Sequence, residues 1–275
     1  YGNFAKVRNH GVDLSIDYGK QISKDFTLQF KGTFTFARNK VLEYDEAPGL
    51  RPGMKTVGRR LNTFLGYVTN GLYENYTDVE ESPTSTLGNI AISPGDIKYV
   101  DQPDANGNYD GRITSDDRVE IGDPWIPEIV YGFGPSMRWK NWDFSFFFQG
   151  QTNVSLIMEN FEPFGERSAR GVLAWIADDY WSPDYPNVNA KHPRLTRLTN
   201  NHNMQVSTYW LRDASFLKLK NVELGYSYKK ARFYISGSNL LTISPFKHWD
   251  PEVGTGAGMQ YPTQRIFNLG IQMSF

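Results

Sequence analysis

Residues 25–37 read DFTLQFKGTFTFA, and this stretch sets the pattern on which the fold depends. Apolar side chains fall on every second residue, and most of the residues between them are polar. The apolar set is Phe26, Leu28, Phe30, Phe34 and Phe36, and the other set is Thr27, Gln29, Lys31, Thr33 and Thr35. Because successive side chains of an extended strand point to opposite faces, the stretch predicts a strand with one apolar and one polar face.

The same alternation recurs along the chain, in residues 12–18, 129–140, 142–149, 222–228, 232–241 and 267–275. Phe147 interrupts it in the third of these stretches. Leu217 and Leu219 are out of phase with the strand that follows them, which predicts a β-bulge near Lys220 and Asn221. The sequence therefore predicts about eight to ten strands, most of them with two unlike faces.

Short polar turns alternate with long connections between these strands. The predicted turns are residues 19–25, 140–141 and 229–230, and the long connections are residues 39–60, 75–127, 152–207 and 244–262. Residues 96–100 favour a short strand within the second connection. Residues 169–180 have the spacing of a short helix within the third, which Pro183 and Pro186 would end. Short turns at one end and long loops at the other are typical of outer-membrane barrels.

Alternation alone also fits a soluble β-sandwich, but two features favour a membrane. The strands run to about ten residues or more, the length that crosses a bilayer at a tilt, whereas soluble strands are nearer five or six. Their apolar faces are mostly aromatic or Leu, with rings gathered near the strand ends as in an aromatic girdle. The sequence therefore predicts an all-β fold, a transmembrane antiparallel β-barrel segment with long extracellular loops.

Polar faces would then line a wet lumen. The charged members of these faces are Asp13, Asp17, Lys31, Arg138, Lys140 and Arg232. Such residues either line a permeation path or form a solvated wall that contacts a plug, and the structural role is favoured.

The composition of the 275-residue chain excludes several classes of protein. Its formal charge is −1 and its pI is about 6.5, which gives no reason to propose a nucleic-acid partner. Aromatic residues make up 15% of the chain, so disorder is excluded, and no stretch is long and apolar enough for a membrane-spanning helix. There is no Cys, which excludes a disulfide scaffold. The chain begins at Tyr1 without Met or a leader, so we expect an internal start in a longer protein.

Three stretches together resemble a known family. They are residues 94–100 (PGDIKYV) with residues 110–113 and 116–118, then residues 121–150 from IGDP to DFSFFFQG, and residues 209–226 (YWLRDASFLKLKNVELGY). In order and spacing they are similar to the C-terminal part of the SusC/RagA-type TonB-dependent outer-membrane receptors of the Bacteroidetes, and the final Phe275 fits as well.

The resemblance implies both an architecture and a function. Such receptors are plugged barrels of 22 strands, so residues 1–275 would be the C-terminal part of one barrel domain, without the plug and the early strands. The missing part would then be another chain, or the product of a split or cleavage. A complete barrel of eight strands is the alternative. The implied function is active import of an oligosaccharide or peptide across the outer membrane of a Gram-negative bacterium, with a SusD-like surface lipoprotein, the TonB complex and the lipid bilayer as partners.

Residues 106–117 have the ligand spacing of a twelve-residue calcium loop. The candidate metal ligands are Asn106, Asn108, Asp110, Arg112 through its carbonyl, Thr114 and Asp117, with Gly111 at the sharp turn. Amides replace two carboxylates, and the last acid is Asp rather than Glu, so any calcium site would be weak. A loop closed by its own Asx-turns, without metal, is the favoured alternative.

Aromatic side chains in the third loop are candidates for stacking on sugar. Trp175, Trp181 and Tyr185 are the predicted substrate residues, with Tyr180 beside them. The favoured alternative is that Leu173, Trp175, Ile176 and Tyr180 form the buried face of a short helix. No H-E-x-x-H or G-x-S-x-G motif is present, so we expect no enzyme. The competing function is a soluble all-β carbohydrate-binding or glycosidase domain.

Overall fold

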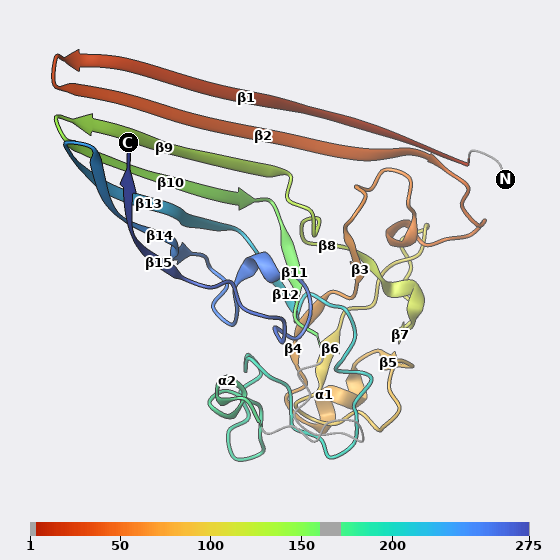
Figure 1. The fold of residues 1–275 in the computed structure, drawn as a ribbon. Helices are drawn as coiled ribbons and strands as arrows, with labels where there is room; N and C mark the ends of the chain where they lie inside the picture. The colour runs from red at the N-terminus through yellow and green to blue at the C-terminus, as the bar shows by residue number, and fades with distance from the viewer. Residues whose placement is uncertain (1–3, 160–171, 275) are drawn as a thin grey trace.

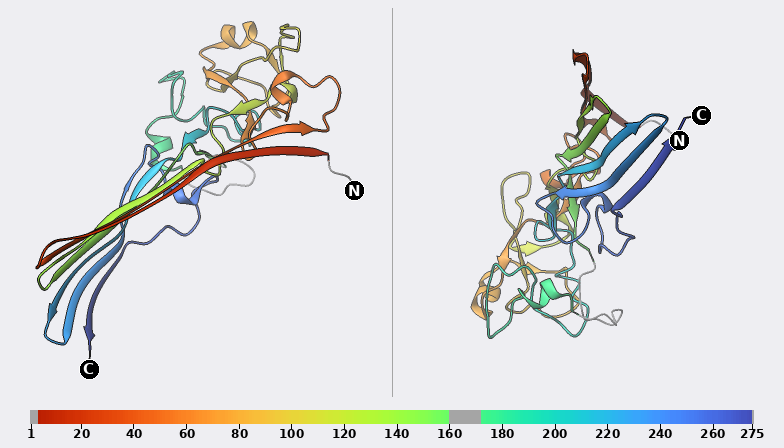
Figure 2. Two further views of the ribbon diagram at one scale, coloured as in Figure 1. Left: turned by 90° about the horizontal axis from the view of Figure 1, so that it is seen from above. Right: turned by 60° about the vertical axis from the view of Figure 1, so that its left-hand side comes forward.

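The computed structural model describes residues 4–159 and 172–274, and within them the chain is all-β. Seven long strands form one antiparallel sheet in the order β1-β2-β9-β10-β13-β14-β15. Their bounds are β1 Ala5–Ser23, β2 Phe26–Tyr44, β9 Ile129–Trp139, β10 Trp142–Thr152, β13 Phe216–Tyr228, β14 Ala231–Ile243 and β15 Ile266–Met273. Figures 1 and 2 show these strands side by side in a twisted, curved layer, with the connecting loops gathered at one end.

The register of the sheet brings the apolar residues of neighbouring strands onto one face. One row across six strands is Phe26, Trp139, Trp142, Tyr226, Phe233 and Ile271. Another begins with Leu14 opposite Phe34, which in turn lies opposite Tyr131. The other face carries the polar partners, such as Asp17 opposite Lys31. The two unlike faces predicted strand by strand therefore become two unlike faces of the whole sheet.

The predicted β-bulge is confirmed. The register shifts between Phe147 and Phe148 where β10 pairs with β13, and between Leu219 and Asn221 where β13 pairs with β14. The extra residue returns Leu217 and Leu219 to the apolar face, so the bulge keeps this face continuous.

Phe147, which interrupts the alternation, lies on the polar face for a packing reason. A Cβ placed on Gly132 of the neighbouring strand would lie 2.8 Å from the Phe147 ring. Tyr234 likewise covers Gly270, its direct partner on β15. Each ring fills the space that a glycine leaves on the adjacent strand, which is a known way of supporting glycine in sheets.

The apolar face of the sheet is exposed rather than packed. Leu14, Phe233 and Leu269 are 51%, 45% and 84% exposed, and Trp139 is 56% exposed. A β-sandwich would bury these side chains against a second sheet. The described residues form no second sheet over this face, since the remaining strands pair only in short two-stranded sheets. The fold therefore does not support the soluble sandwich.

The connections fold into a separate layer of short elements, which we call the loop body (residues 45–128, 153–159, 172–215 and 244–265; Figure 1). Its strands are β3 Phe64–Gly66, β4 Thr69–Leu72, β5 Thr84–Ser85, β6 Ile97–Tyr99, β7 Arg112–Ile113, β8 Val119–Ile121, β11 Ser155–Ile157 and β12 Leu211–Asp213. Its helices are α1 Tyr76–Glu81 and α2 Ala174–Ala177, with 3₁₀ turns η1 Pro52–Met54, η2 Ser115–Asp117 and η3 Pro251–Val253.

Nearly all of the buried apolar core lies in the loop body. Its largest fully buried apolar members are Tyr73, Tyr99, Ile97, Ile113, Leu156, Ile157, Met158 and Ile176. The large sheet instead keeps its apolar face outside. Water-excluding packing therefore holds the loops together, and the sheet is held by its backbone ladder.

Several predicted boundaries change. The first turn is only residues 24–25, because β1 continues to Ser23. The sheet has seven long strands instead of eight to ten. Of the helix predicted at residues 169–180, the structure describes residues 172–180, and α2 covers four of them. Phe275 lies outside the described residues. None of the helices that the structure describes is long and apolar enough to cross a bilayer.

Candidate functional site: the polar wall and the loop body

A charge cluster crosses three strands on the polar face of the sheet. The Arg232 guanidinium donates to Asp143 and, at 2.6 Å, to Glu223. Asp143 lies directly opposite Gly225, and a Cβ on Gly225 would lie 2.5–2.6 Å from both charged groups. The missing side chain thus leaves room for the ion pair to pass over β13. The charges of Arg232 and Asp143 neutralise each other. This supports a structural role, rather than a permeation role, for the predicted lumen charges.

A second cluster ties the last loop to the same face. Lys218 on β13 is fully buried, and its Nζ donates to Asp250 at 2.6 Å and to Glu252. Lys220 also donates to Glu252, at 2.7 Å. Burial alone would raise the pKa values of Asp250 and Glu252, but the hydrogen bonds and charge of Lys218 outweigh it and lower both. The loop after β14 is therefore held by a buried cation against the polar face of the seven-stranded sheet, which we call the polar wall.

The second and third long loops are joined by a buried carboxylate. Asp96, fully buried, accepts hydrogen bonds from Arg194 at 2.7 and 3.0 Å and from the side-chain amides of Asn200 and Asn203, both at 2.9 Å. His202 lies beside this cluster and donates its Nε2–H to the Ile97 carbonyl oxygen at 2.7 Å. These contacts place a buried anion where the second and third long loops meet.

A third junction fixes the loop body to the rim of the sheet. Glu128, just before β9, accepts from Arg38 on β2 at 2.6 and 2.9 Å and from Asn153 after β10 at 3.3 Å. Arg60 lies 3.5 Å from the same carboxylate and also binds Glu120. These contacts fix the positions at which the long loops leave the strands of the sheet.

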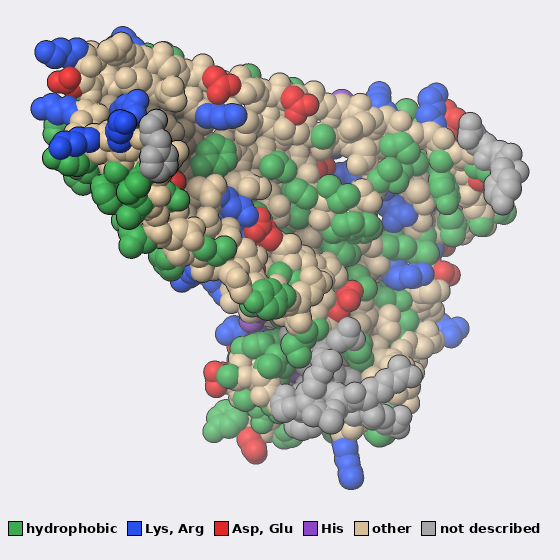
Figure 3. Space-filling view, in the orientation of Figure 1, with side chains coloured by type: hydrophobic (Ala, Val, Ile, Leu, Met, Phe, Trp, Pro, Cys, Tyr) green, Lys and Arg blue, Asp and Glu red, His purple; other side chains and the backbone are tan. Residues whose placement is uncertain are grey.

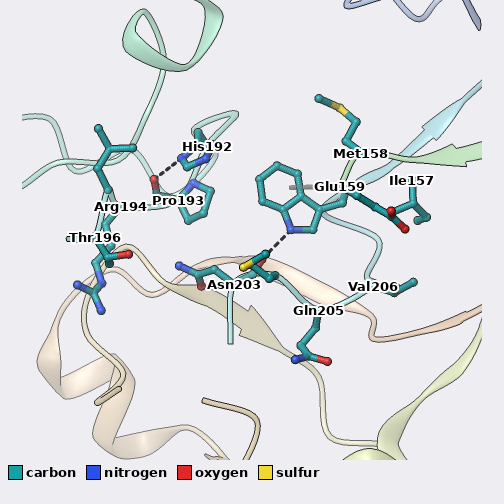
Figure 4. Close-up of a pocket in the computed structure, with 13 residues that line it drawn as sticks. Ile157, Met158, Glu159, His192, Pro193, Arg194, Thr196, Asn203, Gln205 and Val206 are labelled. Atoms are coloured by element: carbon teal, nitrogen blue, oxygen red, sulfur yellow. Dashed lines mark hydrogen bonds between the residues drawn. The ribbon is translucent and has the colours of Figure 1, made fainter. Parts of the chain in front are cut away.

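A cavity of about 140 Å³ opens in the loop body (Figure 4). Three separate segments line it: residues 157–159, 192–196 and 203–206, together with Trp210. Its size is close to that of a cavity of about 150 Å³ that holds benzene, so it admits one ring or one side chain. Within the cavity wall, Trp210 donates its indole N–H to the Asn203 carbonyl oxygen at 2.7 Å.

Arg51 closes the predicted calcium loop in this structure. Its guanidinium binds Asp110 at 2.5 Å and Asp117 at 2.7 Å. The other Asp117 oxygen accepts from the Thr114 backbone N–H at 2.6 Å, so both oxygens are engaged. Asp104 holds the tip of the loop by accepting from the backbone N–H groups of residues 106 and 108. Asx-type contacts therefore hold the tip of the loop, and Arg51, from outside residues 106–117, binds its two carboxylates.

The remaining predicted ligands do not converge on a common point. Asn106, Asn108 and Arg112 are exposed, and Thr114 caps η2 through the Asp116 N–H. Among residues 4–159 and 172–274, no group of three His, Cys, Asp or Glu is placed to hold a metal. Calcium binding stays a prediction, and it would require Arg51 to leave the two carboxylates.

The three predicted substrate aromatics differ in environment. Trp181 is only 7% exposed and packs over Gly95, whereas Tyr185 is 78% exposed. Trp175 is half-buried, with its ring 4.7 Å from that of His248. Trp175 and Trp181 belong to the packed core, and sugar stacking remains a prediction. Sequence reasoning missed the cavity because its wall comes from three distant segments.

Known proteins are similar to this chain along nearly its whole length. TonB-dependent receptor P3 of Formosa agariphila is 27% identical over 99% of this chain, and TonB-dependent receptor SusC of Bacteroides thetaiotaomicron is 26% identical over 99%. The structure titled "Structure of the RagAB peptide transporter" superposes on all of the chain, with a TM-score of 0.73 and 24% identity. The resemblance to SusC/RagA-type receptors is confirmed. No protein-family model matches the chain.

The SusC/RagA-type likeness covers only part of each relative. The chain spans 29% of receptor P3, 27% of SusC and 30% of the solved RagAB chain. The all-β antiparallel fold of the described residues is therefore shared with the solved RagAB chain, and most of each relative lies outside the match.

Proposed function

We propose that this chain is the C-terminal part of the barrel of a TonB-dependent SusC/RagA-type receptor in the outer membrane of a Gram-negative bacterium. The observation that carries the proposal is the exposed apolar face, continuous across seven strands and opposite a polar face. In water such a face would be costly, because each buried apolar Å² is worth about 25 cal/mol. In hydrocarbon it is the expected outer surface of a barrel.

The height of this face supports the membrane placement. β9 and β10 each have 11 residues. At about 3.3 Å per residue and a tilt of about 45°, such a strand spans about 25 Å, the height of the apolar band of outer-membrane barrels. On β2 the face ends at Phe36, and Arg38 and Lys40 follow at the next positions of the same parity.

The open edges support a larger barrel. β1 and β15 lie at the two ends of the strand order and do not pair with each other. Unpaired backbone groups cost several kcal/mol each in hydrocarbon, so further strands of the same barrel would pair with both edges, and a plug would face the polar wall. A complete eight-stranded barrel is not favoured, since the described sheet does not close.

Within this proposal the receptor imports an oligosaccharide or a peptide. The loop body faces outside, because long loops of such barrels are extracellular, and it would contact a SusD-like surface lipoprotein. Energy would come from the TonB complex through parts of the receptor beyond this chain. The polar wall, the buried charge clusters and the cavity in the loop body are consistent with passage and capture of a solute, and no enzymatic role is proposed.

Membrane fractionation tests the proposal. We expect the protein to stay in the membrane pellet through salt and alkaline washes, to dissolve only in detergent, and to migrate differently on gels before and after heating. Release into buffer as a compact monomer would overturn the proposal and favour a soluble domain.

A further inference from the structure

The end of the sheet that carries the short turns is strongly basic. We call this end the turn rim and define it by the residues of its three hairpin turns: Lys24, Asp25, Lys140, Asn141, Lys229 and Lys230. Four of the six residues are cations and one is an anion. All four lysines are exposed, and none forms an ion pair within the described part of the chain under the usual 4 Å limit. Figure 3 shows Lys and Arg side chains gathered at this end, at the upper left.

Backbone hydrogen bonds join the turns into one continuous edge. The Lys140 N–H donates to the Asp25 carbonyl oxygen at 2.8 Å, and the Ser227 N–H donates to the Asn141 carbonyl oxygen at 2.8 Å. The Ser274 N–H reaches the Lys230 carbonyl oxygen at 2.9 Å. With strands about 4.8 Å apart, neighbouring hairpins put a lysine about every 10 Å along the rim.

Rings lie directly beside the rim on the apolar face. Phe26, Trp139, Trp142, Tyr226 and Phe233 form a row in register, which we call the aromatic row. Lys140 Nζ lies 5.6 Å from the centre of the Trp139 ring, and Lys229 Nζ lies 5.4 Å from the centre of the Tyr228 ring. The cations therefore sit at the boundary where the apolar surface ends, at the level that lipid headgroups occupy.

The backbone conformation of the turns does not favour lysine at two of these four positions. Five described residues other than glycine have positive φ; three are Asn, and the other two are Lys140 and Lys229, at +53° and +51°. Hairpin turns of this kind prefer Asn, Asp or Gly at such positions, because a longer side chain makes the left-handed conformation costly. Turn geometry thus disfavours lysine at two sites where the rim nevertheless has it.

We propose that the turn rim binds the anionic headgroups of phospholipids in the leaflet that surrounds the short turns. The inference rests on the membrane placement proposed above and adds a lipid preference to it. Exposed cations at a membrane boundary attract anionic headgroups, and the attraction is worth about a fivefold preference for each lysine near the surface. The aromatic row anchors the depth, and the lysines select the headgroup.

Fluorescence quenching by brominated lipids tests whether the turn rim prefers anionic headgroups. The complete receptor containing this chain is reconstituted into vesicles of equal parts phosphatidylglycerol and phosphatidylcholine, with only one of the two lipids brominated at a time. Trp139 and Trp142 report contact, and a Trp139→Phe, Trp142→Phe variant gives the background from the other Trp residues. We expect phosphatidylglycerol to be preferred about fivefold at low salt, and the preference to shrink toward one at high salt.

The variant set removes charge without spoiling the turns. Lys140→Asn and Lys229→Asn suit the positive φ, and with Lys24→Gln and Lys230→Gln they should bring the preference close to one. A variant with Arg at the same four positions should retain the preference for phosphatidylglycerol. A matched control replaces four exposed lysines of the opposite end, Lys6, Lys40, Lys55 and Lys247, by Gln, and should leave it unchanged.

The outcomes separate this inference from the proposed function. Equal quenching by both lipids in the wild type, or an undiminished preference in the four-lysine variant, overturns the headgroup preference and leaves the membrane placement standing. Absence of quenching by either lipid overturns the membrane placement, and the inference fails with it.

Discussion

At the residue scale, single side chains connect parts of the loop body that are far apart in sequence. Arg51 binds Asp110 and Asp117, which follow it by 59 and 66 residues. Asp117 is fully buried and Arg51 is mostly buried, so removing Arg51 leaves the Asp117 carboxylate without its cation. A single guanidinium therefore does what a bound cation would do in a metal loop.

Replacing Arg51 tests that role. We expect Arg51→Gln to cost about 3–5 kcal/mol locally, because it leaves a buried carboxylate without its cation. Faster hydrogen exchange of residues 101–117 would show the loss. Adding calcium to this variant tests the predicted metal ligands as well: slower exchange with calcium would support them, and no response would count against them.

Gly95 has a conformation and a neighbour that both exclude a side chain. Its φ is +85°, and a Cβ there would overlap the Trp181 ring. Backbone strain alone costs about 1–3 kcal/mol at such a position. Gly95→Ala should lower the stability of the loop body by more than this, because the new methyl group also meets the Trp181 ring. Gly107→Ala is the matched control, since Gly107 has φ +87° with nothing within 4 Å. Equal melting shifts for the two variants would show that the Trp181 contact does not matter.

At the scale of the element, the two faces of a strand have opposite requirements. On β10 the Phe146 ring packs on the apolar face between the rings of Phe144 and Phe148, with its centre 5.7 and 5.8 Å from theirs. Ser145, its neighbour in sequence, points to the polar face opposite Glu223. The pair offers a test of which side meets lipid.

Phe146→Arg should cost about 2–4 kcal/mol in vesicles, because it places a charge near the middle of the apolar band. Ser145→Arg should change stability little, since the polar face is wet and Glu223 lies opposite. Denaturant unfolding in vesicles measures both. A loss below about 0.5 kcal/mol for Phe146→Arg would place that ring away from the lipid.

The loop after β14 should respond to acid. Asp250 and Glu252 have folded-state pKa values below the ordinary 3.8 and 4.5 because Lys218 binds them. Their contribution is therefore present above these ordinary values and is lost as the pH falls through the lower folded values. Trp249 fluorescence should change as the loop is released below about pH 4. Lys218→Met should remove this transition, and an unchanged acid transition in that variant would assign it to other groups.

At the scale of the whole molecule, the sheet is an open surface with two free edges. β1 has 19 residues and β15 has 8, and neither has a second partner strand among the described residues. Exposed edges next to an apolar face favour pairing between chains. The loop body has its own core and does not depend on closure of the sheet.

Expressed alone, the chain should therefore aggregate or form mixed oligomers in detergent, whereas the full-length receptor should give one heat-modifiable species. Size-exclusion chromatography with gels of heated and unheated samples measures the difference. A monomeric, heat-modifiable product from the isolated chain would mean that the seven strands close without further partners.

Much of the sheet could be read from the sequence because the alternation of side chains is a local property. Residues 25–37, the turns at 140–141 and 229–230, and the bulge at Lys220 and Asn221 each follow from neighbours within a few positions. Where the local pattern was ambiguous, as in residues 19–25, the predicted turn was too long, since the polar residues there continue β1.

The sequence by itself determined which side of each strand is apolar, and with it the exposed face that points to a membrane, because side-chain direction in a strand depends only on parity. Only the tertiary structure decided what the loops do. In the tertiary structure Arg51 pairs with Asp110 and Asp117, and Trp181 packs over Gly95. Three distant segments also come together there to line a cavity. Such contacts join residues tens of positions apart, and many other pairings of the same charges and rings satisfy the sequence pattern equally well.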